Sequence, residues 1–168
     1  MSLFIWSQVL IIIAIVFDLV SFQFKQRKKI VGCLCVSGIL ISAHFTLLEQ
    51  WTAAGLMLLA SFRYFTSIFT TSKKLMFLFL TSALVITCMT FSGLISLLSF
   101  GGTVFQTTAA FCQSDHRLRQ LMIVGTSLWL IHNYLAGSPT AVLMEFLFIG
   151  SNIIGYYRYY GMSLQAQR

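Results

Sequence analysis

Three charged side chains, Asp18, Arg63 and Glu145, lie inside long apolar runs of the sequence. A charge in a lipid-like interior costs about 2.5–3.5 kcal/mol on insertion scales, and such residues usually face an internal cavity or a partner. Arg63 is therefore a candidate for binding an anionic or polar solute. The structural alternatives are an ion pair with Asp18 and an extended side chain that reaches the nearer membrane surface.

Two histidines, His44 and His132, each stand alone in separate apolar runs. Carboxylates and imidazoles can take up and release protons in solute transport. We therefore consider a polar cluster of Glu145 with either histidine, which would gate the solute path or couple it to protons. The structural alternative is a hydrogen bond that holds neighbouring helices together.

Amide and aromatic side chains form a second candidate group. An indole face and carboxamides would suit a ring-shaped polar solute, and the residues of this type inside apolar runs are Gln106, Trp129, Asn133 and Asn152. A buried tryptophan more often serves packing than binding. The pair Gly101-Gly102 predicts a close helix contact or a hinge.

The composition defines the solvent around these residues. Of the 168 residues, 58% are hydrophobic and 9% charged, whereas soluble domains carry roughly 25% charged residues. Because the apolar runs recur to the end of the chain, we expect a single integral membrane domain over residues 1–168. The four cysteines are scattered and fit no zinc-site spacing, so neither a metal nor a cofactor is expected.

A helix that crosses a bilayer needs roughly 20 mostly apolar residues. The sequence predicts an all-α membrane protein with seven such helices, over residues 3–24, 30–48, 52–72, 75–92, 94–112, 120–136 and 139–157. Pro139 stands where the last helix begins, a position at which its missing N–H removes no helical hydrogen bond.

The basic residues indicate the orientation, because short cytoplasmic loops retain Lys and Arg. Of eleven basic residues only Arg63 lies outside the first, third and fifth connections and the C-terminus. This pattern predicts an external N-terminus and a cytoplasmic C-terminus. The charge follows one membrane face and suggests attraction to anionic lipid and no nucleic-acid binding. The residues are Lys25, Arg27, Lys28, Lys29, Lys73, Lys74, Arg117, Arg119, Arg158 and Arg168.

An internal duplication is indicated by a shift of 88 positions, which places His44 on His132 and Asp18 on Gln106. The same shift places the basic first connection on the basic fifth one. We expect a three-plus-one-plus-three arrangement, with repeats over residues 3–72 and 94–158 and a spacer helix over residues 75–92. Three helices have odd parity, so the spacer makes the repeats parallel. Parallel repeats are a known transporter architecture with a solute site near the midplane.

Several short motifs resemble those of the bacterial inner-membrane YgjV family, within the SWEET/PQ-loop (MtN3-like) superfamily. They cover nearly the full chain and are Ser21-Phe22-Gln23-Phe24-Lys25-Gln26-Arg27, His44-Phe45, Val104-Phe105-Gln106, Trp129-Leu130-Ile131-His132-Asn133 and Ser151-Asn152-Ile153-Ile154-Gly155.

This resemblance implies a seven-helix fold and solute movement by alternating access. SWEET-like carriers use an asparagine in the third helix of each triple, a position that Asn152 matches in the second triple. Tyr64, beside Arg63, takes that position in the first.

The favoured function is that of a small-solute transporter or facilitator of the bacterial inner membrane, with a polar solute and the lipid bilayer as its partners. A receptor or assembly protein that binds without transport is the alternative, and assembly with further copies of the chain stays open. No catalytic motif or phosphate-binding Gly-rich loop is present, so we expect no enzyme.

Overall fold

The computed structural model of the chain describes residues 3–47, 51–91, 93–135 and 139–161. Within them the predicted all-α class is confirmed: there are seven α-helices and no strand. Arg168, which the predicted orientation included, lies outside the described residues. The helices are α1 (Leu3–Ser21), α2 (Arg27–Leu47), α3 (Trp51–Phe69), α4 (Lys73–Met89), α5 (Leu94–Ala110), α6 (Asp115–Leu135) and α7 (Pro139–Tyr156), followed by a π-helical turn, η1 (Tyr157–Gly161).

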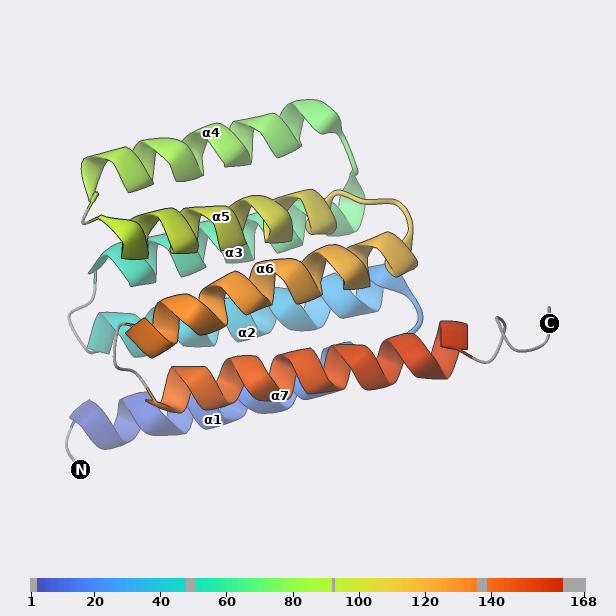
Figure 1. Cartoon of the computed structure of the whole chain (residues 1–168), viewed down its shortest axis with the longest axis horizontal. Coiled ribbons are helices and arrows are strands. Elements are labelled where there is room, and N and C mark those ends of the chain that lie inside the picture. Colours follow the sequence, from blue (N-terminus) through green and yellow to red (C-terminus); the bar gives the residue numbers. More distant parts are fainter. Residues whose placement is uncertain (1–2, 48–50, 92, 136–138, 162–168) are drawn as a thin grey trace.

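The helices lie side by side and alternate in direction, so α1 begins at one end of the bundle and α7 finishes at the other (Figure 1). Exposed basic side chains gather where α1, α3 and α5 end, and we call this the basic end. They are Lys25, Lys28, Lys29, Lys73, Lys74, Arg117 and Arg158. The other end, where α1 begins, is called the opposite end.

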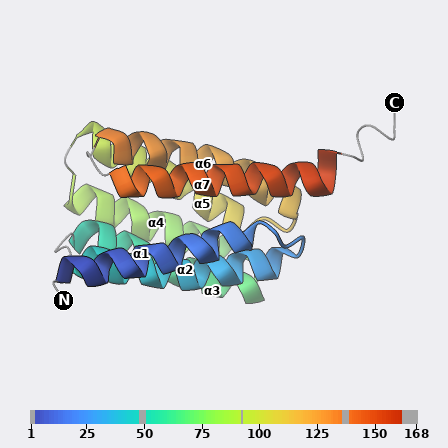
Figure 2. The same ribbon diagram turned by 90° about the horizontal axis from the view of Figure 1, so that it is seen from below.

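Two groups of helices make up the bundle. In the N-terminal group α2 packs against both α1 and α3, and in the C-terminal group α6 packs against both α5 and α7. Figure 2 shows α1, α2 and α3 on one side and α6 and α7 on the other. The groups meet where α1 contacts α7 and where α3 contacts α5, while α4 packs chiefly on α5.

The outer surface of the bundle is apolar. Large apolar side chains point outward along the helices, among them Ile12, Phe62, Phe77 and Phe146, whereas Asp18, Arg63, Glu145 and Asn152 are buried inside. A soluble protein rarely exposes so much contiguous apolar surface. By length and composition alone, Arg27–Leu47 and Thr140–Tyr160, each of 21 residues, could cross a bilayer, and three shorter apolar helical segments accompany them.

Two helices begin three or more residues earlier than the sequence predicted. Helix α2 begins at Arg27 and α6 at Asp115, whereas residues 30 and 120 were expected. Hydropathy placed the charged residues in loops, although Lys, Arg and Gln are good helix formers. As a result, Arg119 belongs to the second turn of α6 and is fully buried.

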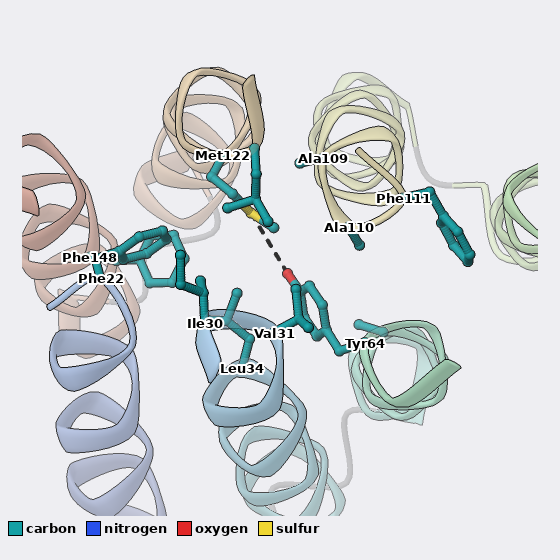
Figure 3. Packing of buried hydrophobic residues seen from close by; sticks show 12 residues of the cluster. Phe22, Ile30, Val31, Leu34, Tyr64, Ala109, Ala110, Phe111, Met122 and Phe148 are labelled. Carbon is teal, nitrogen blue, oxygen red and sulfur yellow. Dashed lines mark hydrogen bonds between the residues drawn. The ribbon is translucent and has the colours of Figure 1, made fainter. Parts of the chain in front are cut away.

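The larger apolar core lies toward the basic end and joins both groups. Phe22, the residue directly after α1, packs edge-on against Phe148 of α7, with ring centroids 4.8 Å apart. Tyr64 of α3 reaches toward α6, where its hydroxyl donates to the Met122 sulfur, with 3.8 Å between oxygen and sulfur (Figure 3). This cluster fills the space between the groups with side chains at this level.

Two glycines set the crossing of α5 and α6. A Cβ added at Gly102 would lie 2.6 Å from Cδ1 of Trp129 and 3.0 Å from the carbonyl oxygen of Gly125. A Cβ at Gly125 would lie 2.9 Å from the carbonyl oxygen of Gly102. The helices are therefore in backbone contact here, as small residues allow in membrane bundles. The sequence left open whether Gly101-Gly102 forms a hinge or a close helix contact. Gly102 forms a close contact.

We expect Gly102→Ala to destabilise the fold by about 1–3 kcal/mol, because overpacking forces the two backbones apart. Gly101→Ala is the matched control, since its Cβ would meet only the flexible end of Leu128, at 3.3 Å. Thermal unfolding of both variants in the same detergent tests this contact. Equal melting temperatures for the two variants would show that α5 and α6 do not touch at Gly102.

Candidate functional site

Arg63 lies on the side of α3 that faces α5. Its side chain is 2% exposed, and Nη1 donates a hydrogen bond to Oγ1 of Thr107 at 2.8 Å. The guanidinium carbon lies 4.5 Å from the ring centroid of Tyr64, within cation–π range. Nε and Nη2 have no hydrogen-bond partner. Because α3 ends at Phe69, Arg63 is about 9 Å from the basic end along the helix.

Thr107 is a site residue that the sequence reasoning missed. Its hydroxyl donates to the carbonyl of Thr103 at 2.6 Å and accepts from Arg63, so it holds the guanidinium in one place. A signal for it exists in the sequence, because buried hydroxyl residues recur on one face of α5 at spacings of three or four. They are Ser96, Ser99, Thr103 and Thr107.

The predicted ion pair between Arg63 and Asp18 is wrong. Asp18 is buried on α1, and the side chain of Ser37 on α2 hydrogen-bonds its carboxylate. Among the described residues, the one ion pair within 4.0 Å joins Arg119 Nε to Asp115 at 3.9 Å. Helix packing is the reason: Asp18 faces α2, whereas Arg63 points across to α5.

Gln106, the candidate aligned with Asp18, lies partly buried on α5. Its Cγ is 2.9 Å from where a Cβ of Gly125 would be. Asp18 and Ser37 precede Gln106 and Gly125 by 88 positions each. The contact of α1 with α2 and that of α5 with α6 therefore use corresponding positions.

The two histidines make the same hydrogen bond in their separate groups. Nδ1 of His44 donates to the carbonyl of Ser7, and Nδ1 of His132 donates to the carbonyl of Ile95, both at 2.9 Å. A carbonyl only accepts, so Nδ1 carries the proton in each ring. Ser7 and Ile95, like the histidines, are 88 positions apart.

Glu145 comes together with Asn133 and not with a histidine. Asn133 Nδ2 donates to Glu145 Oε1 at 3.4 Å, which links α6 to α7 toward the opposite end. Both side chains are buried. His132 is the sequence neighbour of Asn133, but its ring points to α5. The predicted cluster of Glu145 with a histidine is thus replaced by a carboxylate–amide contact.

Trp129 and Asn152 lie deep in the C-terminal group. The indole of Trp129 packs against Gly102, and its Nε1 has no hydrogen-bond partner. Asn152 is fully buried on α7, where Nδ2 donates to the backbone carbonyl of Arg119 at 2.8 Å and Oδ1 has no partner. These contacts bind helices of one group to each other.

Two arginines at the basic end cross between the groups, and the sequence reasoning placed both in loops. Arg119 of α6 donates from Nη1 to the carbonyl of Phe22 at 3.0 Å and from Nη2 to the carbonyl of Phe24, just beyond α1. Arg27 of α2 donates from Nη2 to the carbonyls of Ser67 in α3 and Ala110 in α5. Cations at helix C-terminal ends are stabilised by unpaired carbonyls and by the helix dipole.

Comparison with known proteins agrees with this inner-membrane character. Residues 5–163 match the model of the Imp-YgjV family, described as "Bacterial inner membrane protein". The chain is 29% identical over 150 residues to the inner membrane protein YgjV of Escherichia coli (strain K12), an alignment that covers 88% of this chain and 82% of that protein. No solved structure matches the chain significantly. Because the family model matches almost the whole length of this chain, the chain belongs to the YgjV family of bacterial inner membrane proteins.

Proposed function

We propose that the chain is a seven-span carrier of small polar solutes in the bacterial inner membrane. In this proposal α1–α3 and α5–α7 are two parallel three-helix repeats, α4 is the spacer that joins them, and the solute site lies between the repeats around Arg63. One observation carries the proposal, namely that the contacts between the two groups are reciprocal.

Reciprocity is clearest where the third helix of each group meets the first helix of the other. Arg63 of α3 donates to Thr107 of α5, and Ser151 of α7 donates to the carbonyl of Leu19 of α1 at 2.6 Å. Ser151 follows Arg63 by 88 positions, and Thr107 follows Leu19 by 88 positions. These matched positions support a two-fold axis along the bundle, although the acceptor is a hydroxyl in one contact and a backbone carbonyl in the other.

The basic end repeats the pattern in its acceptors, although the two donating arginines are 92 positions apart and do not correspond. Arg119 binds the carbonyl of Phe22 and Arg27 binds that of Ala110, and those carbonyls are again 88 positions apart. Helices at corresponding positions also run in the same direction (Figure 1). Parallel repeats with an axis along the membrane normal are known in transporters, which rock one repeat against the other around a central site.

Distance measurements between the repeats test alternating access. Spin labels at Gln26→Cys and Ser114→Cys report on the basic end, and labels at Thr46→Cys and Tyr134→Cys report on the opposite end. All four side chains are exposed, and each pair is related by the 88-residue offset. A carrier in nanodiscs should give two distances at each end, with one end widening as the other narrows. A single fixed distance at both ends would contradict the carrier and favour a receptor or assembly role.

The orientation gives a separate prediction. In a cysteine-free background, we expect Thr90→Cys at the opposite end to react with a membrane-impermeant maleimide in intact spheroplasts. Gln113→Cys at the basic end should react only after permeabilisation, because the exposed Lys and Arg of this end belong on the cytoplasmic side. Both positions are exposed. Labelling of Gln113→Cys in sealed spheroplasts would reverse the orientation.

A further inference from the structure

We propose that the site at Arg63 takes a small monocarboxylate anion, bound side-on by Nε and Nη2 of the guanidinium. This inference rests on the proposed function and names the chemical class of its solute. It follows from the unused half of a buried guanidinium and from the contrast with Arg119 and Arg27.

The unused half has the geometry of a carboxylate receptor. Nη1 is engaged by Thr107, and the two nitrogens without a partner are Nε and Nη2. In a guanidinium these two lie on one edge and present parallel N–H groups, which match the two oxygens of a carboxylate. A buried charged donor that is left unpaired is costly, so an anion at this edge would be stabilised strongly.

The protein supplies no anion of its own at this edge among the residues that the structure describes. Asp18 is engaged by Ser37, Glu145 by Asn133, and Asp115 lies beside Arg119. Asp18 and Glu145 are nevertheless close enough to act electrostatically on Tyr64, next to Arg63. Any ionised carboxylate there would repel a dianion such as phosphate more strongly than a monoanion. The guanidinium supplies a single positive charge, which also favours a monovalent solute.

Two other arginines show how a structural arginine is held in this chain: Arg119 is fully buried and Arg27 is half-buried. Each leaves its buried Nε without a hydrogen-bond partner, whereas Arg63 leaves both Nε and Nη2. Arg119 directs both terminal nitrogens to carbonyls beyond the end of α1, and Arg27 directs one nitrogen to two helix-end carbonyls. Partial negative charge at these helix ends compensates the cations. Arg63 differs from both, because its bonded nitrogen donates to the Thr107 hydroxyl in the last turn of α5 and not to a helix-end carbonyl.

Two neighbouring groups fix the position of Arg63. Tyr64 covers one face of the guanidinium at 4.5 Å, and Thr107 fixes its Nη1 edge. The hydroxyl of Tyr64 donates to the thioether of Met122 at 3.8 Å and also interacts with the side chain of Arg63, and a thioether is a weak acceptor. That hydroxyl can turn to donate to a carboxylate oxygen held by Arg63.

Binding is tested by thermal shift and by isothermal titration on the purified full chain in detergent. The probes are acetate, propionate and lactate, with chloride and sulfate as ionic controls and glucose and ribose as neutral solutes. The expected result, with the monocarboxylates alone, is a rise in melting temperature that grows with the logarithm of ligand concentration, since a ligand of the folded state stabilises it by RT ln(1 + [L]/Kd). The titration heats should saturate.

Variants assign this binding to the guanidinium edge. Arg63→Gln should abolish carboxylate binding, and Arg63→Lys should weaken it at least tenfold, because an ammonium cannot form the paired bonds. Arg117→Gln, an exposed control at the basic end, should bind as the parent does. If Arg63→Gln does not fold, Thr107→Val keeps the charge but frees Nη1, and a several-fold loss of affinity is then expected.

Carboxylate shifts of equal size in the parent and in the Arg63 variants would overturn the inference, as would binding of neutral solutes alone. Failure of the carrier proposal is distinguishable from this result. Two alternating distances without carboxylate binding would keep the carrier and reject the anion. Carboxylate binding with one fixed distance at each end would keep the anion site and reject transport.

Discussion

Replacing Gly155 by alanine should prevent stable folding or lower the free energy of unfolding by roughly 3–5 kcal/mol. A Cβ at this position of α7 would overlap the carbonyl oxygen of Phe22 and Nη1 of Arg119, and the Phe22 carbonyl carbon would be 3.2 Å away. Overpacking costs about 1–3 kcal/mol, and a lost hydrogen bond to a charged group about 1.5–3 kcal/mol. The yield of monodisperse protein and its melting temperature measure the effect.

Gly150→Ala is the control for this prediction, because it lies on the same helix and its Cβ would meet nothing within 4 Å. The control should unfold at the temperature of the parent or slightly above it, since alanine is the better helix former. If Gly155→Ala were as stable as Gly150→Ala, α7 could not lie against the end of α1 as described.

Replacing Arg119 by methionine should destabilise the fold by roughly 3–5 kcal/mol, because two carbonyls at the end of α1 lose a charged donor, each worth about 1.5–3 kcal/mol. Arg119 is 0% exposed, whereas Arg117, two residues before it, is exposed. Arg117→Met should therefore stay within about 0.5 kcal/mol of the parent. Chemical denaturation of both variants in mixed micelles gives the comparison.

Because Gly155→Ala and Arg119→Met break the same contact, their effects should overlap. The double variant is expected to be less destabilised than the two single effects combined, since interacting residues are not additive. Full additivity would show that Gly155 and Arg119 act on separate parts of the molecule, and the contact between α1, α6 and α7 would have to be revised.

The helices were predictable because apolar runs and polar breaks alternate so regularly. The predicted starts at residues 3, 94 and 139 coincide with those of α1, α5 and α7. Errors arose where a polar residue continued a helix, as at Arg27 and Arg119. Hydropathy assigns such residues to water, and cannot register that carbonyls at a neighbouring helix end take the place of water.

The contacts inside the bundle were predictable only where they follow the internal offset. Aligning His44 with His132 anticipated that the two would occupy corresponding places, and both donate to a carbonyl of the first helix of their group. Which helix faces Arg63 could not be read from the sequence, because depth along a helix does not determine direction around it. Asp18 has a suitable depth to meet Arg63 but points toward α2.

The hydrogen bond between Arg119 and Phe22 spans 97 residues, and this separation matters while the chain is being made. At about 5–20 residues per second, the ribosome needs roughly 5–20 s to reach Arg119 after Phe22 has been added. During that interval the carbonyls at the end of α1 lack their final donor. A nascent chain that stalls before α6 would therefore expose an unfinished helix end to quality-control proteases. In this respect the second half of the protein would act as an intramolecular chaperone for the first.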